Sequence, residues 1–469
     1  MAYTIEQKPN QLAGANSPMV FVLKEDSSAI YNADKFRYIA QVYISTTDAS
    51  TWVERAKLKI HKNLVNVGIV DVHKIVRSYL ETQEQNVGNQ ETIAGSIHSI
   101  GISDTSNSYS QNTSQVVGVK IEGGYEKASS PTAAPTETLN QANTIIYSIP
   151  ATTPYTDTGT NVGGLDIDGT NNPLTNYIPS GATKKFLTNS PRVQFVRGGN
   201  TASDNVDELT LAFINDGLIT DGDSIVKIAI EYYNKTGGQI GATKYFTNDV
   251  ASGGKATADD VKNSLLYFGC GTYNLEAQVD EPDNQPSEFT DWAYYVIYGA
   301  DGSGNQETDK YYFYRYGSGA TVDDRHQSCS RYDNIRLAWR NRLGAWDYMN
   351  FRGKSTESVD IKRSDSASVS GTWNSATFTY DNTDRGKKTL YTEATRKLTI
   401  NSDWLNDDEG AWLEELFTST NVHILGDSNI VYPVVITDKA YTKKTSVNNK
   451  VKIQYTINLE YANKVRTNS

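Results

Sequence analysis

Short segments in which every second residue is apolar restrict the fold of this chain more than any other feature. The clearest, at 36–44, places five such side chains on one face: Phe36, Tyr38, Ala40, Val42 and Ile44. This spacing matches the two-residue repeat of a β-strand, whose alternate side chains point to one side of a sheet. Comparable aromatic and β-branched segments recur at 209–214, 225–233, 292–298, 311–316, 335–339, 396–400, 430–436 and 451–460. The sequence therefore predicts a mainly β protein.

The length of 469 residues predicts roughly two to four domains, because globular domains usually hold about 100–200 residues. We expect several β-sandwich or barrel-like units with a few short capping helices. These are an amino-terminal β-rich domain at 1–125, a second β domain at 192–318 and a carboxy-terminal β domain at 319–469. Seven of the 12 prolines lie between 131 and 191, amid Thr and Asn residues, so 126–191 is predicted to be a long polar arm or linker.

One clear helix is predicted near 407–419, in the last of these domains. Asn406 and Glu409 have the spacing of an N-terminal capping pair. Three apolar residues at helical spacing would form its buried face: Leu413, Leu416 and Phe417. Three large side chains earlier in the domain are predicted to complete its structural core: Trp339, Trp346 and Phe351.

Charge and motif content argue against several functions. A net charge of −11 without a dense Lys/Arg segment disfavours nucleic-acid binding. The five histidines are scattered, the two cysteines lack zinc-ligand spacing, and neither a phosphate-binding glycine loop nor a nucleophile elbow is present. Asp/Asn-rich stretches at 166–172 and 301–305 lack the Glu that closes a calcium loop, which favours ordinary turns. We therefore predict no catalytic, cofactor-binding or metal-ligating residue, and no enzyme activity.

The chain also lacks the signals of membrane insertion. Residues 1–12 have neither the basic start nor the apolar stretch of a secretion signal, and no apolar run approaches the ~20 residues that span a bilayer. Two cysteines are too few for a disulfide scaffold. We expect synthesis in a reducing cytoplasm and no membrane insertion.

The segment 311–316 carries aromatic rings on both faces of a short predicted strand: Tyr311, Tyr312, Phe313, Tyr314 and Tyr316. A solvated face would be polar, so this pattern predicts burial between sheets or against a partner. We expect the strand to be an exposed edge through which copies of the chain associate. An alternative is that the aromatic hairpin at 292–316 stacks on sugars.

Three segments resemble structural proteins of tailed bacteriophages, especially phages of Bacteroidetes and marine bacteria. The most distinctive is CSRYDNIRLAWRNRLGAWDYMNF at 329–351. The others are FRYIAQVYIS at 36–45 and AWLEELFTS at 411–419, which leads into YPVVITD at 432–438 and a last strand ending at Asn463. The residues that make up these motifs are packing and turn residues, so the resemblance implies a virion role without assigning a site.

The resemblance implies a non-enzymatic structural component of a bacteriophage virion, placed in the tail, tail hub or baseplate. The expected partners are further copies of the chain, arranged as a homo-oligomeric ring, and other phage tail or baseplate proteins. A first alternative is a receptor- or carbohydrate-binding protein at the tail tip, with a host surface receptor as partner. A second is a tail-associated hydrolase that uses acids such as Asp323 and Asp324.

Overall fold

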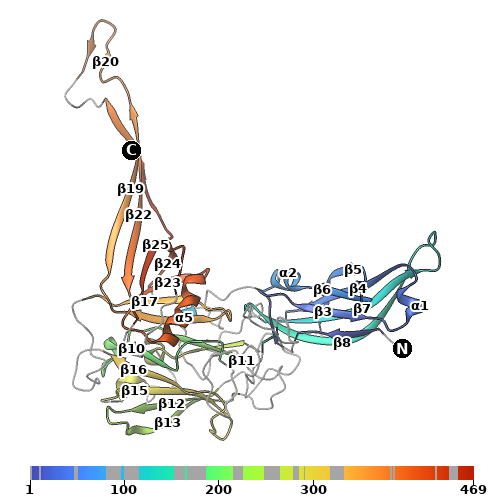
Figure 1. The fold of residues 1–469 in the computed structure, drawn as a ribbon. Coiled ribbons are helices and arrows are strands. Elements are labelled where there is room, and N and C mark those ends of the chain that lie inside the picture. The colour runs from blue at the N-terminus through green and yellow to red at the C-terminus, as the bar shows by residue number, and fades with distance from the viewer. Residues whose placement is uncertain are drawn as a thin grey trace. The chain divides into compact units, whose positions relative to one another are not determined.

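The fold is described from a computed structural model of the chain. It describes residues 3–9, 12–46, 51–80, 97–99, 116–152, 164–165, 186–214, 225, 227–247, 265–277, 285–289, 291–316, 332–380, 383, 386–427, 430–442 and 453–468. Within these ranges the protein is mainly β, with several sheets and a few short helices, which confirms the predicted fold class (Figure 1). The chain forms two compact units. The first comprises 1–328, 340–349 and 427–429, and the second comprises 329–339, 350–426 and 430–469.

The amino-terminal part of the first unit is a sandwich of two sheets. A three-stranded sheet has the order β1 (Thr4–Gln7), β3 (Val20–Lys24), β6 (Val67–Asp71). A six-stranded sheet has the order β5 (Val53–Ile60), β4 (Asp34–Ser45), β7 (Val117–Ala128), β8 (Thr136–Ile149), β2 (Leu12–Gly14), β9 (Gly164–Leu165). Short helices α1 (Ser28–Tyr31), α2 (His73–Arg77) and η1 (Ile97–Ser99) lie in the connections.

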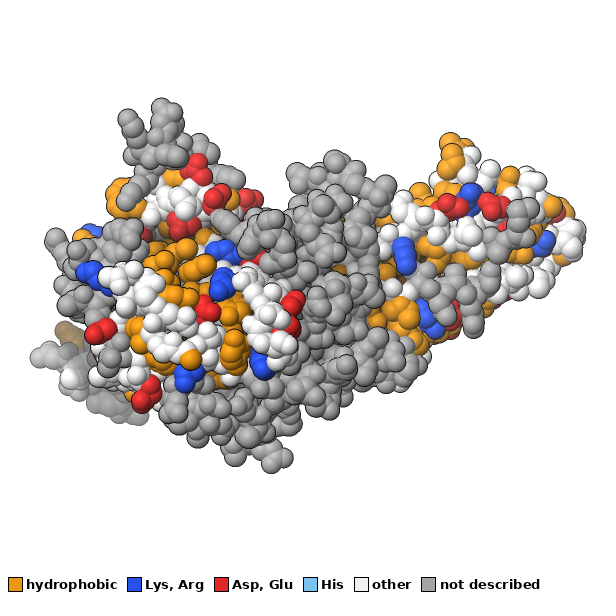
Figure 2. Space-filling view, turned by 90° about the horizontal axis from the view of Figure 1, so that it is seen from below, with side chains coloured by type: hydrophobic (Ala, Val, Ile, Leu, Met, Phe, Trp, Pro, Cys, Tyr) orange, Lys and Arg blue, Asp and Glu red, His pale blue; other side chains and the backbone are white. Residues whose placement is uncertain are grey.

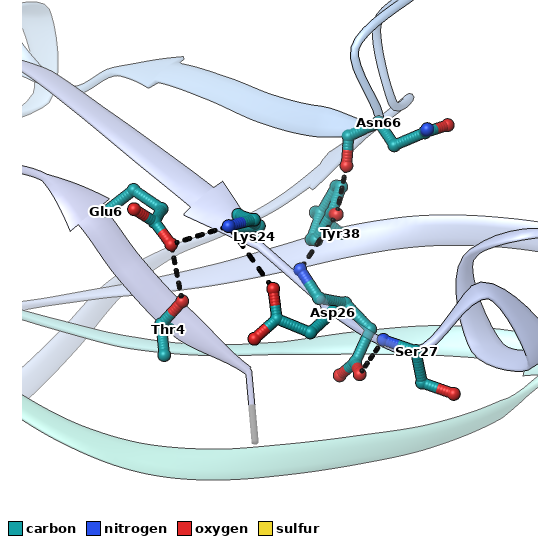
Figure 3. Close-up of polar contacts among 8 residues, drawn as sticks. Thr4, Glu6, Lys24, Asp26, Ser27, Tyr38 and Asn66 are labelled. Carbon is teal, nitrogen blue, oxygen red and sulfur yellow. Dashed lines mark hydrogen bonds and ion pairs between the residues drawn. The ribbon is translucent and has the colours of Figure 1, made fainter. Parts of the chain in front are cut away.

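The alternating residues at 36–44 form the core face of β4, as predicted. Tyr38 is fully buried there, and its hydroxyl donates to the carbonyl of Asn66 at 2.5 Å and accepts from the amide of Glu25 at 3.1 Å. Figure 3 shows this hydroxyl beside an exposed cluster in which Lys24 bridges Glu6 at 3.1 Å and Asp26 at 3.2 Å. The buried hydroxyl is thus satisfied by backbone, and burial raises the pKa of Tyr38.

The rest of the first unit is built on a five-stranded sheet. Its order is β10 (Val193–Arg197), β16 (Tyr311–Tyr316), β15 (Tyr294–Ala300), β12 (Lys227–Tyr233), β13 (Gln239–Thr247). A two-stranded sheet joins β11 (Thr210–Ile214) to β14 (Leu265–Gly269). The helices are η2 (Ala202–Asp204), α4 (Thr272–Glu276) and η6 (Pro286–Glu288). Aromatic contacts such as Phe246 with Phe268, at 6.1 Å between ring centroids, hold the two sheets together.

An eight-stranded sheet dominates the carboxy-terminal part of the chain. Its order is β18 (Trp346–Phe351), β17 (Ile335–Arg340), β23 (Val422–Gly426), β24 (Ile430–Ile436), β25 (Thr456–Tyr461), β22 (Lys387–Asn401), β19 (Thr356–Ala367), and β26 (Val465–Asn468) also pairs with β22. The short strands β20 (Thr372–Trp373) and β21 (Phe378–Thr379) form a separate pair.

Helix α5 (Asp407–Thr418) forms as the sequence predicts. Asn406 Oδ1 accepts from the amide of Glu409 and Glu409 Oε2 accepts from the amide of Asn406, both at 2.8 Å. Leu413 and Leu416 are fully buried, whereas Phe417 is half-buried and contacts Tyr441 with 4.8 Å between ring centroids. The capping pair fixes where the helix begins, and its apolar face covers the sheet.

Two predicted placements differ from the structure. The polar arm does not begin at 126, because residues 136–149 form β8, which is hydrogen-bonded to β7 and β2 inside the first sandwich. Most of 153–185 lies outside the described residues. Trp339, Trp346 and Phe351 are all buried, but Trp346 belongs to the first unit and lies edge-on against His98, with 4.7 Å between ring centroids. Trp339 instead contacts Trp412 of α5 at 4.8 Å.

Candidate interaction surfaces

The aromatic strand β16 is not an edge strand, which corrects the sequence-based expectation. It pairs in parallel with β10 on one side and antiparallel with β15 on the other. On its inner face Tyr311 and Phe313 are fully buried. Both backbone edges of β16 are therefore hydrogen-bonded within the sheet, and pairing through an exposed edge is excluded for this strand.

The outer face of the same sheet carries a row of rings, which we call the aromatic face. Its half-buried members are Phe195, Tyr314, Tyr294 and Tyr233, which lie on four neighbouring strands, and Tyr312, which lies two residues before Tyr314 on the same face of β16. Ring centroids lie 6.4 Å apart between β10 and β16, 4.8 Å between β16 and β15, and 4.9 Å between β15 and β12. Figure 2 shows hydrophobic side chains gathered on this part of the molecule, beside isolated charged ones.

The rings of the aromatic face stand upright against one another. Tyr233 and Tyr294 are nearly parallel, at 4°, and Tyr294 and Tyr314 are inclined by only 22°. At these spacings each ring occupies the π face of its neighbour, so solvent meets mainly ring edges and hydroxyl groups. A sugar that stacks needs an open π face. The geometry therefore gives little support to sugar stacking on this row.

The carboxylate of Glu231 is enclosed by donors beneath the aromatic face. It accepts from the hydroxyls of Tyr233 at 2.7 Å and Tyr298 at 3.0 Å, and Lys310 Nζ lies 3.4 Å away. Burial acts to raise the pKa of Glu231, but these hydrogen bonds and the Lys310 charge outweigh it, and its pKa is lowered. Lys310 also lies 4.3 Å from the centroid of the Tyr298 ring. The charge of this carboxylate is thus balanced within the sheet.

The second candidate surface is a long β-hairpin in the second unit, which we call the hairpin arm: β19 together with Lys387–Thr399 of β22. Residues from Thr356 to Ala367 pair with those from Thr399 to Lys387. No residue of β19, and none from Lys387 to Ala394, is buried. Within the described part of the chain, β19 has no strand on its other side. Figure 1 shows the arm extending beyond the rest of its sheet.

The arm is joined to its own unit through β22, which also pairs with β26 at Tyr391–Ala394 and with β25 at Lys397–Asn401. Its ion pairs are surface pairs, such as Lys387 with Asp365 at 2.8 Å and Arg396 with Glu357 at 3.9 Å, and exposed pairs of this kind stabilise a fold little because solvent screens them. Val359 and Ile361 are 48% and 50% exposed. Only the end of the arm, where Asp365–Ala367 pair with Lys387–Thr389, is two-stranded. Because a two-stranded hairpin in water is at best marginally stable, this end and its exposed apolar residues indicate a surface that a partner covers.

The arm ends in an uncharged aromatic tip, residues 368–380. Its exposed apolar side chains are Val369, Trp373, Phe378 and Tyr380, at 84%, 62%, 52% and 72%. Asn374 Oδ1 accepts from the amides of Ala376 and Thr377 at 3.1 and 2.8 Å and so closes the turn between β20 and β21. Gly371 has φ +112°, and a side chain there would lie 2.5 Å from Cζ of Phe378. The tip is therefore a preformed turn that displays its rings.

Sequence reasoning did not identify the arm or its tip as a surface. It predicted a strand at 396–400, but the pairing of strands separated by the tip is not visible in the periodicity. One signal was present: residues 368–380 contain no charged residue although charged strands flank them. A run of this kind that includes Trp, Phe and Tyr indicates an exposed contact loop or a buried segment, and only the structure separates these two cases.

Other features offer no chemical site among the described residues. Asp301 accepts from the amides of Ser303 and Asn305, both at 2.8 Å, which makes 301–305 a closed turn. Within the described ranges, no group of three or more His, Cys, Asp or Glu side chains is placed to hold a metal ion. Asp323, Asp324 and the stretch 166–172 lie outside the described residues.

A cavity of about 430 Å³ in the amino-terminal sandwich is lined by Tyr31, Asn32, Ala33, Lys35, Phe36, Arg37, His61, Lys62, Glu126 and Pro135. Its lysines are engaged, because Lys62 Nζ donates to Asn32 at 2.8 Å and Lys35 Nζ donates to the carbonyl of Ala133 at 2.8 Å.

Among the helices that the structure describes, none has the length and apolarity to cross a bilayer.

Comparisons with known proteins add no functional assignment. No family model and no curated protein matches the chain. A crystal structure of Salmonella alpha-2-macroglobulin reacted with methylamine aligns with 97% of this chain and 23% of its own, at 9% identity and a TM-score of 0.17. A mutant of the same Salmonella protein aligns at 8% identity and a TM-score of 0.17, over 99% of this chain and 30% of its own. The chain thus spans less than a third of these structures, and likeness at this level does not indicate a shared fold.

Proposed function

We propose that this protein is a non-enzymatic structural component of a bacteriophage virion, placed in the tail, tail hub or baseplate, where it assembles as a symmetric homo-oligomer and joins neighbouring tail proteins. The observation that carries the assembly part is the hairpin arm, in which no residue of β19 and none from Lys387 to Ala394 is buried, and which ends in exposed apolar side chains. A partner surface would bury these groups and stabilise the hairpin.

The virion part of the proposal rests on the resemblance of 329–351, 36–45, 411–419 and 432–438 to tailed-phage structural proteins. The residues that carry this resemblance have packing roles. Trp339 and Leu413 lie in the core of the second unit, and Tyr38 lies in the core of the first sandwich. A shared set of packing residues supports a related architecture, and the β-rich units are compatible with a structural role.

Two measurements test the proposal. Sedimentation of the purified full-length protein should give a defined oligomer, whereas a monomer at every concentration would contradict the assembly part. Mass spectrometry and antibody labelling of purified virus particles should find the protein in the tail. Absence from the particle would contradict the virion part independently of the oligomeric state.

A second candidate function is receptor or carbohydrate binding at the tail tip. The exposed Trp373 at the end of the arm favours it, because a ring that is 62% exposed offers an apolar surface to a ligand. A glycan array and binding to host cells separate this function from self-assembly. Binding that is lost in Trp373→Ala, with an unchanged oligomer, would favour the receptor role.

A further inference from the structure

The tip of the hairpin arm has the chemistry of an anchor for a protein surface. Trp373 and Phe378 face each other across the β20–β21 pair and are 62% and 52% exposed. Trp and Tyr are over-represented among residues that dominate binding energy at protein interfaces. A turn that is already closed by Asn374 loses little conformational freedom on binding. The tip therefore fits an apolar protein surface without unpaired charge.

The aromatic face of the five-stranded sheet is such a surface. It presents the edges of upright rings, and a ring that arrives face-on against ring edges makes the favoured edge-to-face contact. Its carboxylate, Glu231, accepts hydrogen bonds from two tyrosine hydroxyls and pairs with Lys310, so covering the face leaves no unpaired carboxylate. Val193, at the β10 edge of the row, adds a side chain that is 43% exposed.

We infer that the tip of one copy docks on the aromatic face of a second copy. The inference rests on the proposed self-assembly and specifies its contact. Both surfaces belong to every chain, so they occur in equal numbers. At about 3.3 Å per residue the 12 residues of β19 extend over roughly 40 Å, which gives the tip the reach to contact a neighbouring subunit.

A contact between two different surfaces is heterologous, and it sets what assemblies can form. Each copy donates one tip and accepts one tip, so the chain closes into a ring when the rotation between neighbours permits and extends otherwise. An isologous dimer, in which two tips meet each other, is the competing arrangement. Mixing two complementary variants distinguishes them.

The test uses full-length protein and three variants. The tip variant carries Trp373→Ser with Phe378→Ser, and the face variant carries Tyr312→Lys with Tyr314→Lys. The control carries Leu64→Ser with Val65→Ser, which removes apolar side chains that are 103% and 72% exposed outside both surfaces. Circular dichroism and thermal melting establish that each variant is folded. If the face variant does not fold, Val193→Lys replaces it, because that side chain is exposed on an edge strand.

Sedimentation velocity should show assemblies for wild type and control, and a dissociation constant raised at least about tenfold for the tip and face variants alone. An equal mixture of the two variants should form dimers and nothing larger, because the intact tip of the face variant docks on the intact face of the tip variant. These dimers support the inference directly.

Each other result overturns it. If wild type assembles and either variant keeps its assembly, the contact lies elsewhere and only the proposed self-assembly survives. If both variants are monomeric and the mixture stays monomeric, the tip does not dock on this face. If wild type itself is monomeric, the proposed self-assembly fails together with the inference.

Discussion

Strands β16 and β19 differ in how much of their surface the fold itself covers. The aromatic residues of β16 predict an exposed edge strand through which copies associate. In the structure the strand lies between β10 and β15, and Tyr311 and Phe313 are fully buried. β19 is mostly polar and charged, and it forms the edge of its sheet and one side of the projecting arm, where Val359 and Ile361 are left exposed. Aromatic content therefore indicates how much surface a strand must bury, whereas the order of strands in the sheet decides whether the fold or a partner buries it.

We expect the largest effect when a buried and an exposed tryptophan are each replaced and the losses in the free energy of unfolding are compared. Trp339→Ala should lower the free energy of unfolding by about 3–5 kcal/mol, because it empties a fully buried site against Trp412. Trp373→Ala at the tip should change it by less than about 0.5 kcal/mol. Urea denaturation followed by fluorescence measures both. Equal losses would show that the tip is part of the folded core.

Amide hydrogen exchange measures how differently the two strands, β16 and β19, are protected. Amides of β16 are paired on both sides and should exchange slowly in the free subunit, whereas those of β19 should exchange at least about tenfold faster, because opening the arm exposes little buried surface. On assembly, β19 and the tip should become protected while β16 is unchanged. Equal protection of β19 in free and assembled protein would argue against a covered arm.

The smallest expected effect concerns Glu231 under the aromatic face. Its pKa lies below the ordinary value of 4.5 in the folded protein, so the ionised carboxylate stabilises the fold above pH 4.5, and this contribution is lost as pH falls through the folded pKa. Glu231→Gln should lower stability by about 1 kcal/mol at pH 7 and flatten its dependence on pH below 4.5. The exposed Glu414→Gln on α5 is the control. Parallel pH profiles for wild type and Glu231→Gln would contradict the role of this network.

Local signals predicted local structure well. The capping pair of Asn406 and Glu409 placed the start of α5, and the alternation at 36–44 identified the core face of β4. Both depend on residues that are close in sequence, where hydrogen bonds and side-chain direction follow from the backbone repeat. The core face of β4 and the side chains of Leu413 and Leu416 are buried as the sequence predicts, whereas Phe417 is half-buried.

Relations between distant segments could not be predicted in the same way. The partner of β16 is β10, whose Val193 pairs with Tyr312, and nothing in either segment specifies that parallel register. Trp346 was assigned to the wrong unit because the turn after β17 returns to the first unit, where its ring meets His98. The candidate surfaces depend on such long-range pairings, so their composition was visible in the sequence and their exposure was not.

The central claim is that the hairpin arm mediates self-association, and shortening it is the most direct test. Residues 364–391 can be replaced by Asn-Gly, a two-residue turn that suits the antiparallel pairing of β19 with β22 and leaves the strand pairs from Thr356 to Arg363 in place. Sedimentation velocity of the shortened and full-length proteins at equal concentration compares their assembly. The account predicts a folded monomer for the shortened protein and a defined oligomer for the full-length chain. An oligomer of unchanged stoichiometry in the shortened protein would contradict the claim.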